Sequence, residues 1–203
     1  MHLHGQAAHG RGVGQRRHLP RVASANSALQ RARATVADKT PARSQQATLR
    51  SLGEATLQSV IDRWIDAWER NDVRGFAALL AEDASFAMPP LATWYRGRND
   101  VVEWARRYSI NGHWRWKALA TRANGQPTLA FYCWDDAAAA YLPFAMNVLT
   151  LRDDGLVLDV TAFIVRTPQA EDPQDHSRFP DQPVHEHFSQ MYARFGLPDR
   201  LND

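Results

Sequence analysis

The sequence predicts one α+β domain in which three helices cover a curved antiparallel sheet. Apolar residues first recur at helical spacing, and beyond Gly112 their period changes to two. Asn-Gly and Asp-Gly pairs then separate the alternating segments, as hairpin turns do. Because each helix has one apolar side, the helices must pack on one face of the sheet. We therefore expect a cone with an open mouth, over residues 54–167.

The length and composition fit one ordinary domain with extensions. The chain has 203 residues, and 44% of them are hydrophobic, which excludes wholesale disorder. Cys133 is the single cysteine, so an intrachain disulfide is excluded and a reducing compartment is expected. The sequence shows neither an apolar stretch of membrane-spanning length nor a signal peptide. These features predict a cytoplasmic protein without membrane contact.

Charge divides the chain unevenly. Residues 1–50 carry a net charge of +8, whereas the remainder carries −6. Such an asymmetry is expected for an arm that faces a polyanion, joined to a body that does not. The alternative is a solvated tail without a partner, and charge alone does not decide between them.

The arm contains three segments of different composition. Residues 1–20 combine Gly, His and Arg without a hydrophobic period, so we expect disorder, and no metal site because their histidines lack a preformed geometry. Residues 21–38 have helical composition and a thin apolar stripe at Val22, Leu29 and Val36, which predicts an amphipathic basic helix. Residues 39–53 are polar and predict a linker.

Three helices and one strand open the body. The first helix begins at Glu54, follows the i, i+3, i+4, i+7 rule and ends near Asn71. Val73–Leu80 predicts a second helix and Arg98–Tyr108 a third. Ala84–Met88 predicts a short strand between them, which two prolines end.

Four strands follow as two hairpins. His113–Ala120 pairs with Thr128–Trp134 across an Asn-Gly turn. Tyr141–Leu151 pairs with Leu156–Arg166 across an Asp-Asp-Gly turn. Residues 168–203 predict a C-terminal extension, loose at first and ending in a short helix over residues 184–195.

Longer stretches of the body resemble one protein family. They are AWERNDVRGFAALLAEDASFAMPPLATWYRGRNDVVEW (Ala67–Trp104), GHWRWKALATRANGQPTLAFY (Gly112–Tyr132), NVLTLRDDGLVLDVTAFI (Asn147–Ile164) and the closing FGLPDRL (Phe195–Leu201). These resemble the C-terminal SnoaL-like domain of a group of extracytoplasmic-function sigma factors of the sigma-70 family. The resemblance implies the SnoaL-like cone of the nuclear transport factor 2-like superfamily.

The arm resembles another part of the same proteins. VASANSALQRARATV (Val22–Val36) is similar to the end of sigma region four, where a helix enters the major groove of promoter DNA. The resemblance implies RNA polymerase core and promoter DNA as partners of the full-length parent. By position, the DNA-facing residues are Ser24, Asn26, Ser27, Gln30 and Arg31, with Arg21 and Arg33 on phosphates.

The family pattern is incomplete at the N-terminus. Only 20 residues precede the match to region four, and they resemble none of the family's upstream regions. We therefore expect a truncated or mis-started reading frame. The expected function is that of a C-terminal regulatory or sensory module of a sigma factor, which does not initiate transcription as this chain.

Catalysis is the weaker interpretation of the body. Cyclases, isomerases and hydratases of this superfamily move a proton with a pocket Asp or His, and the candidates here are Asp159 and His113. His113 alternates with two tryptophans, so it faces away if they face the cavity, and Asp159 follows a tight hairpin. A stand-alone enzyme of the same fold is the alternative function.

A pocket for an apolar or aromatic small molecule is expected, without a cofactor. Its predicted lining is Trp94, Tyr95, Trp114, Trp116, Asn147 and Phe163. Plain core packing is the alternative for each aromatic residue. The exposed sheet face also suggests a homodimer.

Overall fold

The computed structural model describes residues 30–31, 43–89, 93–164 and 185–202, with side chains omitted at 185–189. The chain forms two compact units, Met1–Ala42 and Arg43–Asp203. In the first unit, Gln30 and Arg31 are helical and exposed. The expected disordered segment and the rest of the expected basic helix lie outside the described residues. The second unit is called the body below.

The body begins earlier than Glu54, because part of the expected linker is helical. Helix α2 (Gln45–Leu52) starts at Ser44, whose side chain accepts a hydrogen bond from the backbone of Ala47. Leu49 is buried against the body. The expectation of a linker over 39–53 is therefore wrong from Gln45 onward. Leu49 and Leu52 form too thin an apolar face for periodicity to reveal.

The next two helices agree with the sequence pattern. Helix α3 (Glu54–Glu69) buries the apolar side that its periodicity predicts, including Trp64 and Trp68. Helix α4 (Val73–Leu79) begins at Asp72, whose carboxylate accepts from the backbone of Arg74 and Gly75. The two helices pack together through Trp64 and Phe76, with ring centroids 5.1 Å apart.

The third predicted helix changes its winding halfway. Helix α5 (Arg98–Trp104) continues directly into a π-helix, η1 (Ala105–Ser109). Two tryptophans then donate to carbonyl oxygens near its end: the indole of Trp114 to Tyr108 (2.9 Å), and that of Trp116 to Ser109 (2.8 Å). These hydrogen bonds satisfy carbonyl groups that a helix end leaves free.

The sheet has six strands in the order β2-β1-β6-β5-β4-β3. Their bounds are β1 Leu80–Ala87, β2 Trp94–Arg96, β3 Trp116–Ala123, β4 Gln126–Asp135, β5 Ala140–Leu151 and β6 Val157–Ile164. The sheet is mixed and not antiparallel throughout, because β1 pairs parallel with β6. That pairing joins segments some 75 residues apart, as in Ser85 with Asp159, and local sequence patterns carry no information about it.

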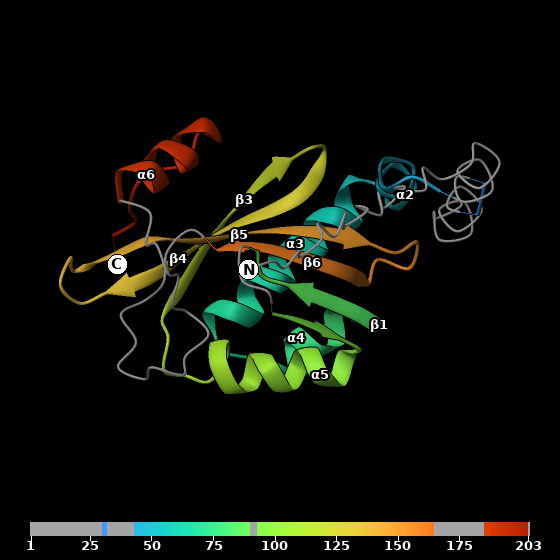
Figure 1. Ribbon diagram of the computed structural model, residues 1–203, viewed down its shortest axis with the longest axis horizontal. Coiled ribbons are helices and arrows are strands. Elements are labelled where there is room, and N and C mark those ends of the chain that lie inside the picture. The colour runs from blue at the N-terminus through green and yellow to red at the C-terminus, as the bar shows by residue number, and fades with distance from the viewer. Residues whose placement is uncertain (1–29, 32–42, 90–92, 165–184, 203) are drawn as a thin grey trace, which may run out of the picture. The chain divides into compact units, whose positions relative to one another are not determined.

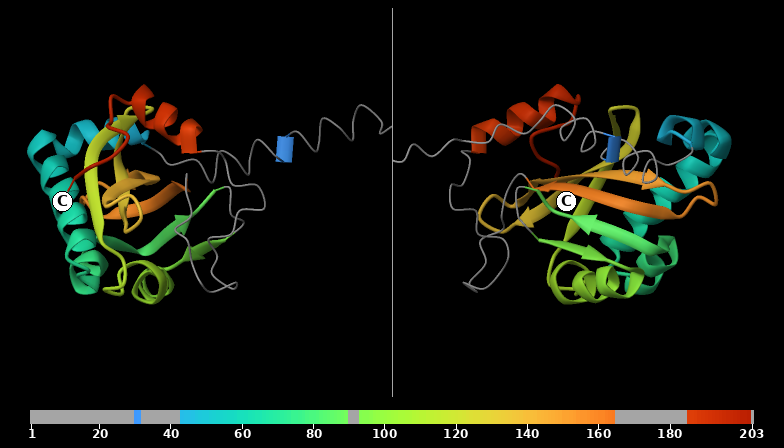
Figure 2. Two further views of the ribbon diagram at one scale, coloured as in Figure 1. Left: turned by 90° about the vertical axis from the view of Figure 1, so that its left-hand side faces the viewer. Right: turned by 45° about the vertical axis from the view of Figure 1, so that its right-hand side comes forward.

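Helices lie on both sides of the strands, and the core therefore has two layers. The views of Figures 1 and 2 place α3 and helix α6 (His185–Arg194) on different sides of β3, β4 and β5. The inner layer is the large buried cluster between α3, α4, α5 and the sheet, with Trp68 and Phe131 among its members. The outer layer consists of Ala130, Tyr132, Tyr141, Met146 and Tyr192.

The C-terminal segment holds the outer layer together through tyrosine hydroxyls. The hydroxyl of Tyr192 donates to the carbonyl oxygens of Phe131 (2.8 Å) and Ala145 (3.0 Å), where the β4–β5 register shifts. The hydroxyl of Tyr132 donates to the carbonyl oxygen of Pro198 (2.9 Å). Burial raises the pKa of both hydroxyls. This covers part of the sheet face on which a homodimer was expected.

Candidate functional site

The inner layer is built around Trp68. Its ring lies 4.7 Å from that of Phe131, 5.7 Å from Trp116 and 5.9 Å from Phe76, in tilted or edge-to-face geometry. Trp116, a predicted pocket residue, is 4% exposed. It is therefore a core residue, and its indole N–H already donates to η1. Trp114 is half-buried and uses its N–H in the same way.

Asn147 is a predicted pocket residue whose polar side chain is buried. It lies on β5 between Leu129 of β4 and Ala162 of β6, and it is 2% exposed. Leu129 and Ala162 both belong to the inner layer. Because side chains alternate along a strand, the Asn147 side chain lies on the same face of the sheet as the inner layer. Its Oδ1 accepts no hydrogen bond from any residue that the structure describes.

Two buried indole groups also lack a hydrogen-bond partner among the described residues. The Nε1 atoms of Trp64 and Trp68 are buried, and neither donates to a partner within the described ranges. Leaving a buried polar group unpaired costs about 1–3 kcal/mol, so each such group calls for an explanation. We call Trp64, Trp68 and Asn147 the interior polar set. Sequence reasoning missed the two tryptophans because helical periodicity marks them only as core.

The interior polar set occupies one part of the inner layer. Helix α3 runs along β3, since Glu54 binds Arg122 near one end and Glu69 accepts from the backbone of Ala118 near the other. Trp64 lies one helical turn before Trp68 on the buried side of α3 and packs on Phe76.

Asn147 pairs with Leu129 of β4, two residues before Phe131 on the same strand. Trp68 packs against Phe131. The inner layer therefore contains two buried hydrogen-bond donors and one buried acceptor without partners among the described residues. A molecule bound there would need to carry both an acceptor and a donor.

Tyr95 and Trp94 lie on opposite faces of the edge strand β2. Tyr95 pairs with Phe86, packs on Trp104 with ring centroids 5.6 Å apart, and contributes to the inner layer. Burial raises the pKa of its hydroxyl, with a smaller contribution from Tyr108. Trp94 alternates to the other face and is 64% exposed. Trp94 therefore lies outside the inner layer.

The remaining predicted pocket and catalytic residues also lie outside the inner layer. Phe163 alternates with the inner-layer residue Ala162 and is 46% exposed. Asp159 alternates with Val160 in the same way and accepts a hydrogen bond from the hydroxyl of Ser85. His113 is exposed in the loop before β3, where its backbone donates to Asn111. Neither catalytic candidate faces the interior polar set.

The predicted DNA-binding residues fall in the first unit. Gln30 and Arg31 are described there, and both are exposed. The others lie outside the described residues: Arg21, Ser24, Asn26, Ser27 and Arg33. Within the ranges given above, no group of three or more His, Cys, Asp or Glu side chains is placed to hold a metal ion. No helix in those ranges is long and apolar enough to cross a membrane.

The fold defines the class of the body. Residues 61–160 match the family model of the SnoaL-like domain. The helices packed on a curved, six-stranded sheet agree with the SnoaL-like fold of that family model. The fold class that the sequence resemblance implied is confirmed, with the sheet mixed.

The particular relatives come from one mycobacterial species. The chain is 31% identical over 180 residues to the "ECF RNA polymerase sigma factor SigG" of Mycobacterium tuberculosis, in strains CDC 1551 and H37Rv. The match covers 87% of this chain and 40% of each relative. The chain therefore spans about two fifths of the length of these relatives. The matched stretch is longer than Arg43–Asp203, so it reaches into the first unit.

Solved structures match this chain at low identity. A putative ketosteroid isomerase from Kribbella flavida is 24% identical with a TM-score of 0.43, and covers 63% of this chain and 93% of its own. A protein of unknown function from Burkholderia xenovorans, similar to nuclear transport factor 2, is 14% identical with a TM-score of 0.47. It covers 65% of this chain and 98% of its own.

Proposed function

We propose that this chain is the C-terminal regulatory module of an extracytoplasmic-function sigma factor and acts by contact with the sigma regions. The observation that carries the proposal is the match to SigG, which spans the body and reaches into the basic first unit. A SnoaL-like domain alone is compatible with many functions, because one fold hosts many sites. A SnoaL-like domain behind a sigma-like segment is a more specific combination.

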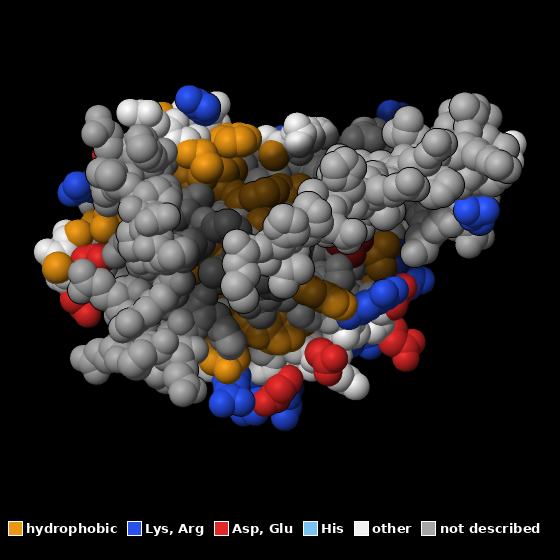
Figure 3. Space-filling model, viewed as in Figure 1, with side chains coloured by type: hydrophobic (Ala, Val, Ile, Leu, Met, Phe, Trp, Pro, Cys, Tyr) orange, Lys and Arg blue, Asp and Glu red, His pale blue; other side chains and the backbone are white. Residues whose placement is uncertain are grey.

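RNA polymerase core and promoter DNA are the proposed partners of the full-length parent. The basic helix of residues 21–38 would place Asn26, Gln30 and Arg31 against base edges, with Arg21 and Arg33 on phosphates. The described body offers no such single-signed surface on the face in Figure 3, where Lys, Arg, Asp and Glu side chains lie intermixed. Over α5, for example, Arg106 donates to Glu103 at 2.7 Å. The mixed charge on this face of the body supports the arm as the proposed DNA-facing part.

Sensing is assigned to the interior polar set. An apolar molecule with one acceptor and one donor would pair with the indoles of Trp64 and Trp68 and with Oδ1 of Asn147. Binding would then shift the body between a closed core and an occupied one, and a ligand shifts such an equilibrium by its difference in affinity for the two states. Transcription would then depend on which of the two states, closed or occupied, contacts the sigma regions.

A transcription assay with a chimera tests the regulatory role. The matching stretch of M. tuberculosis SigG is replaced by this chain, and run-off transcripts are compared with those of SigG lacking the stretch. We expect the chimera to differ from the truncated protein in transcript yield at equal polymerase binding. Identical yields from the two proteins would refute a regulatory role for the body.

A stand-alone small-molecule protein of isomerase or cyclase type is the second candidate function. The placement of the interior polar set inside the core favours it, since small-molecule sites combine apolar walls with a few polar groups. Among the described residues, however, the buried polar side chains outside the tyrosines and Cys133 are Thr48, Thr128 and Asn147, which carry neither carboxylate nor imidazole. General acid–base chemistry uses such groups most often. This supports contact over catalysis.

A further inference from the structure

We propose that Asn124 is a site of spontaneous deamidation, in which the backbone nitrogen of Gly125 attacks the side-chain amide carbon of Asn124. The reaction would convert this amide into a carboxylate in the turn of the β3–β4 hairpin. The modification is independent of the proposed function, because it depends on the chemistry of one turn and not on the relation to sigma factors.

The reaction needs water as its only co-reactant. The Gly125 nitrogen loses its proton to water or hydroxide and forms a bond to Cγ of Asn124. The amide nitrogen of Asn124 takes up a proton and leaves as ammonia, so a cyclic succinimide remains. Water then opens this ring at either carbonyl group. The product is aspartate, or isoaspartate where the main chain continues through Cγ.

Both reacting groups are accessible in the β3–β4 turn. Asn124 and Gly125 are exposed and have positive φ angles of 51° and 73°, as expected for an Asn-Gly hairpin turn. Because glycine has no Cβ, nothing on the Gly125 side hinders the approach of its nitrogen. Within the described ranges, neither the Asn124 side chain nor the backbone N–H of Gly125 has a hydrogen-bond partner.

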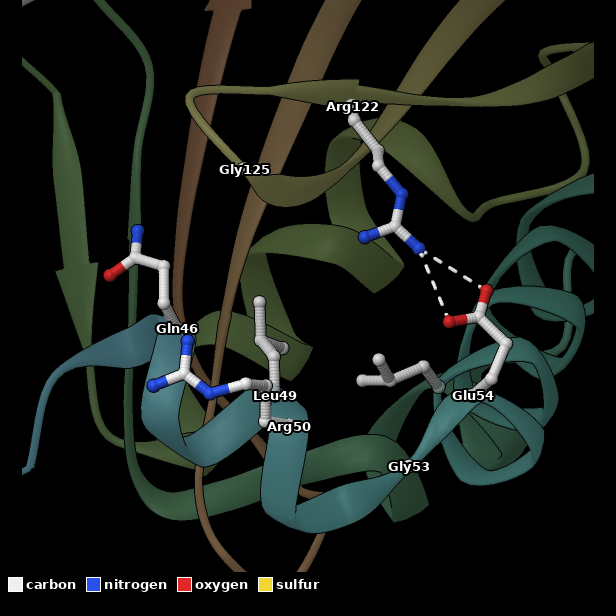
Figure 4. A pocket seen from close by; sticks show the side chains of 8 residues that line it. Gln46, Leu49, Arg50, Gly53, Glu54, Arg122 and Gly125 are labelled. Atoms are coloured by element: carbon white, nitrogen blue, oxygen red, sulfur yellow. Dashed lines mark hydrogen bonds and ion pairs between the residues drawn. The ribbon is translucent and has the colours of Figure 1, made fainter.

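The turn touches α2 without engaging the reacting groups. Figure 4 shows the turn at Gly125 and, on α2, the side chain of Gln46. Nε2 of Gln46 donates to the backbone carbonyl oxygen of Asn124 at 3.5 Å. This hydrogen bond involves neither the side-chain amide of Asn124 nor the nitrogen of Gly125.

A second Asn-Gly pair has the same exposure but different hydrogen bonds. Asn111 and Gly112 are both exposed. Nδ2 of Asn111 donates to the carbonyl oxygen of Arg107 (3.2 Å), and its Oδ1 accepts from the backbone of His113 (2.9 Å). The backbone N–H of Gly112 donates to Oδ1 of Asn71 (3.0 Å). These bonds must open before Asn111 can react, so it should be protected in the folded chain.

The Asp-Gly pair between β5 and β6 is held in a similar way, although aspartate can form the same succinimide. The carboxylate of Asp154 accepts from the backbone of Leu156 (3.0 Å) and pairs with Arg152 (3.2 Å). The backbone N–H of Gly155 donates to the carbonyl oxygen of Arg152 (3.0 Å). Asn124 is therefore the position at which folding leaves such a pair unprotected.

Deamidation would change both the charge and the main chain of the hairpin. Either product adds one negative charge two residues from Arg122. Isoaspartate also adds a methylene group to the main chain. The turn between the paired residues Ala123 and Gln126 has only two residues, so this extra group would disturb their register.

Peptide mass spectrometry of the full chain tests the inference. The chain is incubated in neutral buffer or in concentrated urea and then digested with trypsin, which places Asn111 in the peptide Tyr108–Arg115 and Asn124 in the peptide Ala123–Arg152. The readout is the gain of one mass unit, located by fragmentation. In buffer, Asn124 should react at least about tenfold faster than Asn111, because hydrogen bonds hold Asn111. In urea the two rates should become similar, since glycine follows both residues.

Asn71→Gly is the matched variant, because it removes the acceptor that holds the backbone N–H of Gly112. Glycine also suits the positive φ angle of 54° at this position. The variant should speed deamidation of Asn111 about two- to tenfold. It should leave the rate at Asn124 unchanged.

Either of two outcomes in buffer would overturn the inference. Equal rates at Asn111 and Asn124 in the folded chain would show that the hydrogen bonds do not control the reaction. Conversion of Asn124 in urea but not in buffer would show that the folded hairpin protects its own turn.

Discussion

The inner and outer layers of the core lie on opposite faces of the same strands, and they treat their polar atoms differently. In the outer layer, the hydroxyls of Tyr192 and Tyr132 donate to backbone carbonyls of the body. In the inner layer, Nε1 of Trp64, Nε1 of Trp68 and Oδ1 of Asn147 have no partner among the described residues. Both layers are buried. The difference indicates that the outer layer is complete as folded, whereas the inner layer has hydrogen bonds left to make.

The largest expected effect concerns the outer layer. Tyr192→Ala should lower the free energy of unfolding by about 3–5 kcal/mol, because it removes a buried aromatic ring and leaves a cavity. Tyr192→Phe is the control, and it should lower the free energy by about 1 kcal/mol, since only the hydroxyl is lost. Urea denaturation measures both. Equal, small effects of the two variants would show that the C-terminal segment does not complete the core.

The pH dependence of stability should come from the same layer. Burial raises the pKa of Tyr132 and Tyr192 above the ordinary value of about 10. Their contribution is therefore fully present below pH 10 and is lost as the pH rises above it. The free energy of unfolding should fall by up to about 1.4 kcal/mol per pH unit for each hydroxyl.

The matched variant for this prediction is Tyr192→Phe, which should make the fall above pH 10 less steep in urea denaturation. An unchanged slope would mean that Tyr192 titrates alike in the folded and unfolded chain. The comparison of layers would then lose its electrostatic support.

Asn147→Leu should have a smaller effect, with the opposite sign. It replaces a buried amide, whose Oδ1 has no partner among the described residues, by an apolar group of similar size, so the ligand-free chain should become more stable by about 1 kcal/mol. Thermal or urea unfolding of the full chain measures this. A loss of stability above 1 kcal/mol would indicate that Asn147 already has a partner in the folded chain.

The smallest effect is expected at the sheet edge. Asp159→Asn keeps the side-chain shape and still accepts from Ser85, so the free energy of unfolding should change by less than about 1 kcal/mol. Urea denaturation measures this change in the free energy of unfolding. A large loss would show that the carboxylate has a role that its position on the outer face does not explain.

The sequence predicted the elements that local periodicity determines. The apolar spacing from Leu57 to Trp68 defined α3, and turn residues such as Asn124-Gly125 located the hairpins. The parallel pairing of β1 with β6 escaped prediction because it joins distant segments. Helix α2 escaped because its apolar face is only two leucines wide. Long-range contacts, and not local preference, decided both features.

The candidate site was predictable in part for the same reason. Asn147 stands out in sequence as a polar residue within an apolar strand, and the structure buries it. Trp94 and Phe163 looked like pocket residues, but strand alternation places them on the face opposite the inner layer, where both are exposed. Trp64 and Trp68 looked like ordinary core, because periodicity reports burial and carries no information on whether an indole N–H finds a partner.

Transcription by the SigG chimera tests the central claim most directly when two variants are compared. Asn147→Leu alters the inner layer, and Asp159→Asn alters the opposite face of the same sheet. The account predicts that Asn147→Leu changes the transcript yield of the chimera at equal polymerase binding, while Asp159→Asn leaves it unchanged. Equal yields from both variants and the parent chimera would contradict it.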